Sequence, residues 1–353
     1  MNTPVNVGIL GYGLVSASRT FHVPLVMFEP RLHLSIVSTL LPDEAKQMIP
    51  EVPITTDANE VINDPSIDVI VVALPNTLHY KFAKQALEAG KHVIVEKPLC
   101  ITSAEIRELM ELAHSKGLLL TQFHNRRWDA GFLTVKKLIT NQTCGETRLL
   151  EMNYDRWAPE VTTGWRDGTE LGSGTVYDLG VHLFDQTLSL FGRPLTLSAE
   201  LGSQRPGSQA TDYFNITLGY AEHNVVLRSS MLASLPAPRY RLIGTAGNYV
   251  KHGVDMQAGQ LNDGMLPNNP TYGLDTSEEY GILHDGIHSQ PLPTERGAYD
   301  TFYRQLAAHL IDNGEPPAPL HDAHDIVALV EATYRSAAEK RTLTGDEIGY
   351  YSV

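Results

Sequence analysis

The stretch VNVGILGYGLVS, residues 5–16, is an apolar run that ends in a glycine-rich turn and then opens a helix-like segment. Gly11 permits a tight turn, and Gly13 lets the backbone approach a pyrophosphate at the N-terminus of the following helix. Ser16 stands at the third glycine position of the dinucleotide-binding fingerprint G-x-G-x-x-G, which is normally Gly or Ala. Alone the pattern is weak, because a tight turn without a ligand can carry the same residues. Its place at the first of a series of strands indicates a dinucleotide-binding turn.

The chain up to residue 123 repeats this strand-to-helix rhythm. A helix over residues 78–89 ends at Gly90, and the TSAE sequence at residues 102–105 is typical of a capping box before a helix that ends near Gly117. Such alternation predicts a doubly wound parallel sheet, an α/β fold with helices on both faces. We therefore expect a Rossmann dinucleotide-binding domain over residues 1–123. Its predicted strands are residues 5–10, 32–37, 69–74, 92–95 and 118–123.

Beyond residue 124 helices and strands no longer alternate. The strand candidates here often alternate apolar and polar residues, which is typical of an antiparallel sheet with one more exposed face. Residues 253–293 are rich in Gly, Asn, Asp and Pro and predict loop and a short hairpin. We expect an α+β domain for substrate binding and oligomerisation over residues 124–353, with a large, mainly antiparallel open sheet. Its predicted strands are residues 147–155, 196–203, 213–220, 224–231 and 239–245, and its last helices are near residues 298–312 and 322–340.

The composition limits the class of protein. With 353 residues, 42% hydrophobic and 19% charged, the chain exceeds one usual core and has no apolar run of the roughly 20 residues that span a membrane. The first strand begins at once, so we expect a cytoplasmic protein without a leader. A net charge of -14 disfavours binding to nucleic acid or to an anionic membrane. Cys100 and Cys144 suggest neither a disulfide framework nor a metal site.

The end of the second predicted strand bears on cofactor choice. An Asp or Glu there would bind both ribose hydroxyls of NAD, but the sequence has Ser38 and Thr39. A 2'-phosphate would not be repelled, which favours NADP and leaves NAD possible. Arg19 or Lys46 would have to supply the balancing charge. Ser38 and Thr39 equally fit the role of ordinary strand-end residues.

Two further segments carry candidate chemistry. Lys97 follows the predicted strand 92–95, at the carboxyl edge where open α/β sheets bind ligands, although a solvated lysine at a strand end is common. Asp178, His182 and Asp185 stand at i, i+4 and i+7, so a helix would project them from one face. Their apolar neighbours indicate a buried helix, hence either a site or a structural histidine with a carboxylate partner. A metal is disfavoured, because no third ligand cluster accompanies them.

Alcohol oxidation needs the residue types found in these segments. A hydride and a proton leave the substrate, so the developing alkoxide requires a base and a nearby positive charge. His182 can act as the base and Lys97 can supply the charge.

The chain resembles the glucose-fructose oxidoreductase, inositol dehydrogenase and MocA (Gfo/Idh/MocA) family over nearly its full length. The matching motifs are Gly11-x-Gly13, Ala73-Leu74-Pro75-Asn76-x-x-His79, Glu96-Lys97-Pro98 and Asp178-x-x-x-His182-x-x-Asp185. The resemblance implies that Lys97, Asp178 and His182 form the catalytic group. It also implies that Pro75, Asn76, His79 and Glu96 line the cofactor, and that the open sheet supports homodimers or homotetramers.

Two more motifs resemble one branch of that family. Thr20-Phe21-His22-x-Pro24-Leu25 and the segment 123–129, FHNRRWD, are similar to the branch that contains NADP-dependent scyllo-inositol dehydrogenases. The implied substrate is a sugar or a cyclic polyol, inositol-like, oxidised or reduced at a carbon that bears a hydroxyl. Candidate pocket residues, each of which fits a surface or packing role equally well, are Arg127, Tyr154, Arg156, Trp165 and Arg166.

Two other functions fit the same fold. A non-catalytic dinucleotide sensor would have lost the lysine or the histidine, and both residues are present here. A glycosidase that uses bound NAD for transient oxidation would retain its cofactor and show no net change in nicotinamide absorbance during turnover.

Overall fold

The computed structural model describes residues 4–14 and 16–352, so Val15 of the glycine-rich stretch lies outside the described residues. The chain forms two compact units. The first contains the chain up to Asn125 with Gln257–Tyr272 and Ala298–Ala323, and the second contains Arg126–Met256, Gly273–Gly297 and the chain from His324 onward.

This division differs from the expected boundary at residue 123, which assigns every later residue to the second domain. Two later segments instead pack with the first unit. Helix α9 (Asp300–Asp312) contacts α1 (Val23–Phe28), and the Phe302 ring packs edge-on against Phe123 at a centroid distance of 4.8 Å. This long-range aromatic contact has no local sequence signal.

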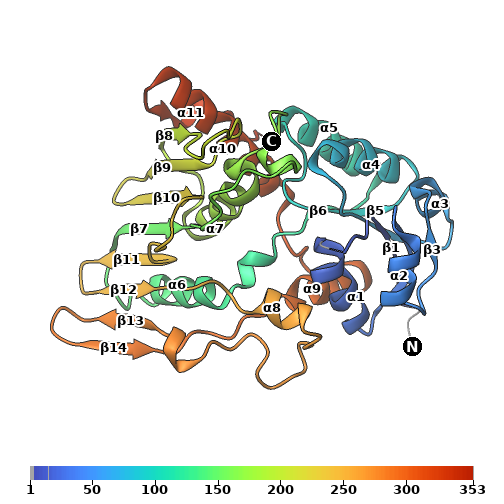
Figure 1. Ribbon diagram of the computed structural model, residues 1–353, viewed down its shortest axis with the longest axis horizontal. Coiled ribbons are helices and arrows are strands. Elements are labelled where there is room, and N and C mark those ends of the chain that lie inside the picture. Colours follow the sequence, from blue (N-terminus) through green and yellow to red (C-terminus); the bar gives the residue numbers. More distant parts are fainter. Residues whose placement is uncertain (1–3, 15, 353) are drawn as a thin grey trace. The chain divides into compact units, whose positions relative to one another are not determined.

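The first unit is built on a six-stranded parallel sheet with the order β3-β2-β1-β4-β5-β6 (Figure 1). The order reverses between β1 and β4, and open sheets of this kind bind ligands at the carboxyl ends of strands beside such a reversal. The sheet confirms the predicted doubly wound fold. Only the two-residue strand β3 was not predicted. The strands are β1 (Val5–Leu10), β2 (Leu32–Ser38), β3 (Ile54–Thr55), β4 (Val69–Val72), β5 (His92–Val95) and β6 (Leu120–Gln122).

Local signals explain where the helices of this unit begin and end. Thr102 accepts a hydrogen bond from the Glu105 amide while Glu105 accepts one from the Thr102 amide, which confirms the capping box. Gly117 then ends the helix with a φ of 64°. This helix is α5 (Ser103–Lys116). The other helical segments are the π-helical turn η1 (Ser18–His22), α2 (Pro42–Met48), α3 (Ala58–Asn63), α4 (Asn76–Glu88) and α8 (Gln257–Asn262).

The second unit contains a nine-stranded sheet with the order β14-β13-β12-β11-β7-β10-β9-β8-β15. Its pairings are antiparallel apart from β7 with β10. This confirms the predicted large, mainly antiparallel sheet, and the hairpin β13–β14 lies within the predicted loop-and-hairpin segment. The strands are β7 (Thr147–Asn153), β8 (Thr196–Gly202), β9 (Tyr213–Gly219), β10 (Asn224–Ser230), β11 (Tyr240–Gly244), β12 (Asn248–Lys251), β13 (Gly281–His284), β14 (Ser289–Leu292) and β15 (Leu343–Thr344).

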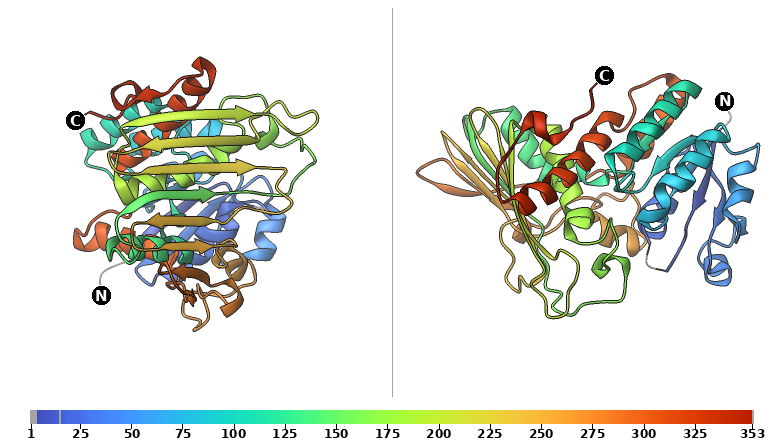
Figure 2. Two further views of the ribbon diagram at one scale, coloured as in Figure 1. Left: turned by 90° about the vertical axis from the view of Figure 1, so that its left-hand side faces the viewer. Right: turned by 90° about the horizontal axis from the view of Figure 1, so that it is seen from above.

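Helices of the second unit lie along one face of this sheet, and the other face carries no helix in the described chain (Figure 2). Alternate residues of β9 and β10 are buried, as the alternating sequence predicts. The helical segments are η2 (Asn125–Trp128), α6 (Ala130–Thr140), η3 (Trp165–Asp167), η4 (Val176–Gly180), α7 (Val181–Phe191), η5 (Ser277–Glu279), α10 (Leu320–Glu339, which begins in the first unit) and α11 (Gly345–Ile348).

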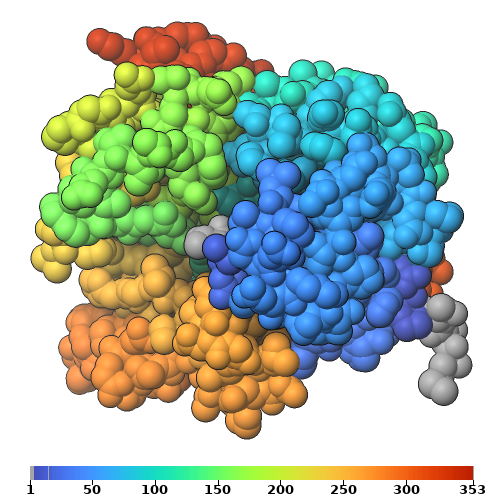
Figure 3. Space-filling model, turned by 45° about the vertical axis from the view of Figure 1, so that its right-hand side comes forward, coloured from blue at the N-terminus to red at the C-terminus, as the bar shows by residue number. Residues whose placement is uncertain are grey.

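The interiors of both units are apolar. All four residues of β4 are fully buried, as are Leu150 and Met152 of β7. On the face seen in Figure 3, the N-terminal segments of the first unit, drawn in blue, come forward. Among residues 4–14 and 16–352, no helix combines the length and apolar composition that crossing a membrane requires.

Candidate active site

The glycine-rich turn leaves β1 in a conformation that only glycine adopts readily. Gly11 has a φ of 92°, and a Cβ there would lie 2.5 Å from the carbonyl oxygen of Ala73. The Gly11 amide donates to Ser38 at the end of β2 at 3.0 Å. Gly11 is therefore required by the fold itself, because its backbone passes directly beside β4 and β2.

Gly13 is different, since the protein leaves space around it. Among the residues that the structure describes, which leave out the nearby Val15, a Cβ at Gly13 would meet the Cβ of Ser16 at 3.8 Å and no other atom within 4 Å. The Ser16 hydroxyl accepts from the Gly13 amide at 3.1 Å and from the Arg19 amide at 3.3 Å. Ser16 thus caps the turn, which explains why a residue other than Gly or Ala fits here. The open space above Gly13 suits a dinucleotide phosphate that approaches the backbone.

The residues at the end of β2 are held by internal contacts. Ser38 and Thr39 are both buried, and the Thr39 hydroxyl donates to the carbonyl of Tyr12 and accepts from the Leu41 amide. No acidic side chain stands at this position, as the sequence indicates. Arg19 lies in η1, and its guanidinium reaches back to the glycine-rich turn, where it donates to the Leu14 carbonyl at 2.7 Å. Lys46 is exposed on α2.

The turn after β4 contributes Pro75, Asn76 and His79. Pro75 caps α4, and Asn76, its first residue, is buried. His79 is fully buried, and its two ring nitrogens lie 2.7 Å from the carbonyl oxygens of Leu74 and Pro98. Burial lowers the pKa of His79, against the opposing effect of the two carbonyls. His79 therefore braces this turn against the segment that follows Lys97.

Lys97 and Glu96 stand directly after β5, where the sequence places them. Lys97 is partly exposed, and its backbone amide donates to Glu96 Oε2 at 3.1 Å. The other carboxylate oxygen of Glu96 lies 2.9 Å from Nε2 of the buried His22, whose Nδ1 contacts the Tyr303 hydroxyl. Burial raises the pKa of Glu96, but the hydrogen bond from His22 and the charge of Lys97 outweigh it and hold the pKa below the usual value.

The row of Asp178, His182 and Asp185 lies across a change of helix type. Asp178 belongs to the π-helical turn η4, whereas His182 and Asp185 belong to α7, and all three are buried. The expected single helix is thus two segments, and wide π turns of this kind often occur at functional sites.

Asp185 has a cationic partner of its own, Arg127. The Arg127 guanidinium holds Asp185 through Nε at 2.9 and 3.0 Å and through Nη2 at 2.6 Å. The exposed fractions of the two side chains are 13% and 1%. Arg127, a candidate pocket residue that fits a packing role equally well, forms a largely buried ion pair that connects η2 to α7.

Asp178 faces two arginines from the segment before it. Arg166 Nε donates to Asp178 Oδ2 at 3.1 Å, and Arg156 Nη1 lies 3.6 Å from the same oxygen. Both arginines are substantially exposed, whereas Asp178 is buried. The Arg166 guanidinium lies over the Trp165 ring at 4.5 Å. The structure thus brings three predicted pocket residues together with Asp178.

Tyr154 links His182 to further arginines. Its ring is 6.4 Å from the His182 ring, centroid to centroid, and the Arg239 guanidinium lies 4.0 Å from its centroid. Arg126 and Arg156 approach the same ring at 5.2 and 5.4 Å. Sequence reasoning missed Arg126 and Arg239. Arg126 is adjacent to a predicted residue, but Arg239 follows no motif and is placed here only by strand pairing.

Other reactive groups are few in the part of the chain that the structure describes. Cys100 and Cys144 are free and buried, and burial raises the pKa of each thiol. The described residues contain no cluster of three or more His, Cys, Asp or Glu side chains that could hold a metal.

Comparison with known proteins finds matches to both units of the chain. Residues 5–124 match the profile of the oxidoreductase family with an NAD-binding Rossmann fold, and residues 136–344 match that family's C-terminal alpha/beta domain. The scyllo-inositol 2-dehydrogenase (NADP(+)) IolW of Bacillus subtilis is 35% identical, over 96% of this chain and 95% of its own. The oxidoreductase YdgJ of Escherichia coli is 39% identical, over 97% and 99%.

Solved structures show the same architecture. The oxidoreductase yvaA of Bacillus subtilis has a TM-score of 0.92 at 35% identity and covers 97% of this chain and 98% of its own. A Yersinia pestis oxidoreductase has a TM-score of 0.91 at 41% identity, covering 98% of both chains. With both units matched, the chain belongs to the Gfo/Idh/MocA oxidoreductase family and carries its NAD(P)-binding Rossmann domain.

Proposed function

We propose that the protein transfers a hydride between a nicotinamide dinucleotide and a carbon that bears a hydroxyl in a sugar or a cyclic polyol. The observation that carries this proposal is Lys97, a partly exposed lysine at the carboxyl end of β5 beside the ionised Glu96. The name of the relative IolW, an NADP-dependent scyllo-inositol dehydrogenase, supports an inositol-like substrate.

The cofactor would be held by the first unit. Gly11, Gly13 and Ser16 would bind its pyrophosphate, and Pro75, Asn76 and Glu96 would line the nicotinamide end. The ribose of the cofactor would lie at the end of β2, where Ser38 and Thr39 replace the acid that NAD-specific sites carry, and this favours NADP. When bound, the nicotinamide supplies the two-electron acceptor or donor of the reaction.

Side chains of the protein stabilise the charge that develops on the substrate oxygen and accept the proton of its hydroxyl. The Lys97 ammonium stabilises the oxyanion that develops when the hydroxyl loses its proton. His182 accepts that proton as general base, because its imidazole can lose and regain a proton near neutral pH. Asp178, paired with Arg166 and Arg156, assists His182.

The bare face of the nine-stranded sheet would form the contacts of a homodimer or homotetramer. This proposed oligomer contact, like the proposed substrate class, rests on the family resemblance.

The assignment of the base is tested by pH profiles of kcat/KM for His182→Ala and Asp178→Asn. Oxidation by the unmodified protein should rise with pH through one ionisation, since neutral imidazole is the active form. His182→Ala should remove that ionisation and lower the rate by about 10²- to 10⁴-fold. Asp178→Asn should be slower but keep the ionisation. If the ionisation survives in His182→Ala and disappears in Asp178→Asn, Asp178 is the base.

A further inference from the structure

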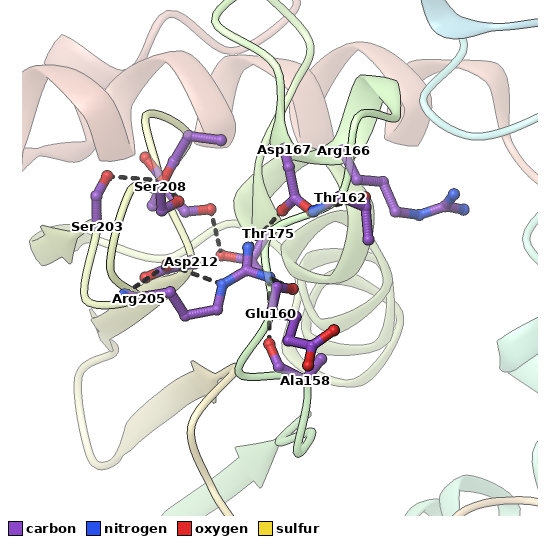
Figure 4. Close-up of polar contacts among 12 residues, drawn as sticks. Ala158, Glu160, Thr162, Arg166, Asp167, Thr175, Ser203, Arg205, Ser208 and Asp212 are labelled. Atoms are coloured by element: carbon purple, nitrogen blue, oxygen red, sulfur yellow. Dashed lines mark hydrogen bonds and ion pairs between the residues drawn. The ribbon is translucent and has the colours of Figure 1, made fainter.

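A buried arginine ties the segment that contains Arg166 to the end of the second unit's sheet. Arg205 follows β8 and is 5% exposed. Its guanidinium donates to Asp167, to Asp212 through Nε at 3.0 Å, and to the carbonyls of Ala158 and Glu160 at 3.2 and 3.1 Å (Figure 4). One side chain thus contacts the loop of residues 158–174 at three points.

On the sheet side of this contact, Asp212 accepts several hydrogen bonds. Asp212 accepts from the backbone amides of Gln204 at 2.6 Å and Arg205 at 3.0 Å as well as from the guanidinium. Burial raises the pKa of Asp212, but these hydrogen bonds outweigh it and keep the pKa below its usual value. The Asp212 carboxylate therefore stays charged at neutral pH and holds the Arg205 guanidinium on the sheet side.

On the loop side, Asp167 connects Arg205 to the candidate site. Asp167 accepts from the amide and the hydroxyl of Thr162, both at 2.8 Å, and from Arg205. Its neighbour Arg166 extends away from Arg205, as Figure 4 shows, and donates to Asp178. In the short helical turn η3, Asp167 thus contacts Arg205 while the adjacent Arg166 contacts Asp178.

We propose that Arg205 is a positioning residue that, through Asp167, places the Arg166 guanidinium on Asp178. The planar fork of an arginine can bind two carboxylates and two carbonyls at once, which a lysine cannot do. The role of Asp178 in this inference rests on the proposed function. Arg205 itself touches neither substrate nor cofactor in this account.

The experiment compares Arg205→Met with Arg166→Met and with the double variant. A control is Arg193→Met, which removes another arginine–carboxylate pair of the same unit, Arg193 with the buried Asp325 at 2.6 Å; the Arg193 side chain is 43% exposed, so this pair is less buried than that of Arg205. Asp167→Asn is a milder variant that weakens only the loop side and serves if Arg205→Met does not fold. The readouts are kcat, cofactor Kd and amide hydrogen exchange over residues 158–174.

We expect Arg205→Met and Asp167→Asn to speed exchange in residues 158–174 and to lower kcat by about 10- to 10²-fold with cofactor Kd unchanged. The double variant should be no slower than Arg166→Met alone, because both changes remove one interaction. Arg205→Lys should restore only part of the loss. Arg193→Met should leave both kcat and amide hydrogen exchange over residues 158–174 unchanged.

Unchanged exchange in Arg205→Met, or decreases in kcat that multiply in the double variant, would overturn the inference. Absence of turnover in the unmodified protein would refute the proposed function instead. In that case exchange alone decides whether Arg205 holds the loop.

Discussion

At the scale of single residues, the buried carboxylates of this protein are stable because each faces a specific cation or hydrogen-bond donor. Asp185 is 1% exposed and is held bidentately by Arg127. Removing one partner of such a pair leaves an uncompensated buried charge, whereas replacing both by apolar residues is often tolerated.

This distinction gives a stability prediction for Arg127. Arg127→Met should lower the free energy of unfolding by about 3–5 kcal/mol, measured by urea denaturation. The double variant Arg127→Met/Asp185→Leu should recover most of that loss, since no charge remains buried. Arg148→Met, which removes an exposed pair with Glu146, should change little. A double variant as unstable as the single one would show that packing, rather than charge, dominates.

Glu96 gives a prediction for the dependence of stability on pH. Its pKa in the folded protein lies below the ordinary value of 4.5, so it stabilises the fold at higher pH and loses that contribution as the pH falls below 4.5 through the folded value. Glu96→Gln should therefore cost about 1.5–3 kcal/mol at pH 7, the worth of a hydrogen bond to a charged group. The difference from the unmodified protein should shrink in acid. A difference that is constant with pH contradicts this account.

At the scale of elements, the glycine-rich turn separates what the fold requires from what a ligand requires. Gly11→Ala should lower the melting temperature, because its Cβ would meet the Ala73 carbonyl and its φ is positive. Gly13→Ala should leave the melting temperature nearly unchanged but weaken cofactor binding, measured by nicotinamide fluorescence. Normal cofactor affinity in Gly13→Ala would mean that no phosphate approaches this backbone.

The elements also show what the sequence could and could not predict. Strands such as β1 and β5 were predicted to the residue, because each is a short apolar run bounded by turn residues. The π turn η4 was not, since nothing local distinguishes it from the start of α7. The partner of Asp185 lies 58 residues away, so its pairing with Arg127 depends on tertiary packing. The same holds for Arg205, which no motif marks.

At the scale of the whole molecule, the proposed function assigns cofactor binding to the first unit and substrate binding to the second. Without an acid at Ser38 and Thr39, kcat/KM should be higher with NADP than with NAD under matched conditions. Arg19 contacts the glycine-rich turn through the Leu14 carbonyl, whereas Lys46 is exposed on α2, so we expect Arg19→Met to reduce the preference for NADP and Lys46→Met to leave it unchanged. A tenfold preference for NAD, about 1.4 kcal/mol, would contradict this prediction.

The central claim, hydride transfer from a carbinol carbon, is tested most directly with deuterium. The protein is incubated with NADP and, one at a time, with inositols and aldoses labelled with deuterium at carbon, and the reduced cofactor is analysed by mass spectrometry. We predict that at least one polyol gives reduced cofactor carrying one deuterium from substrate carbon, and that Lys97→Met binds the cofactor normally but forms the labelled product far more slowly. Reduced cofactor without deuterium, or none across the panel with either NADP or NAD, would contradict the account.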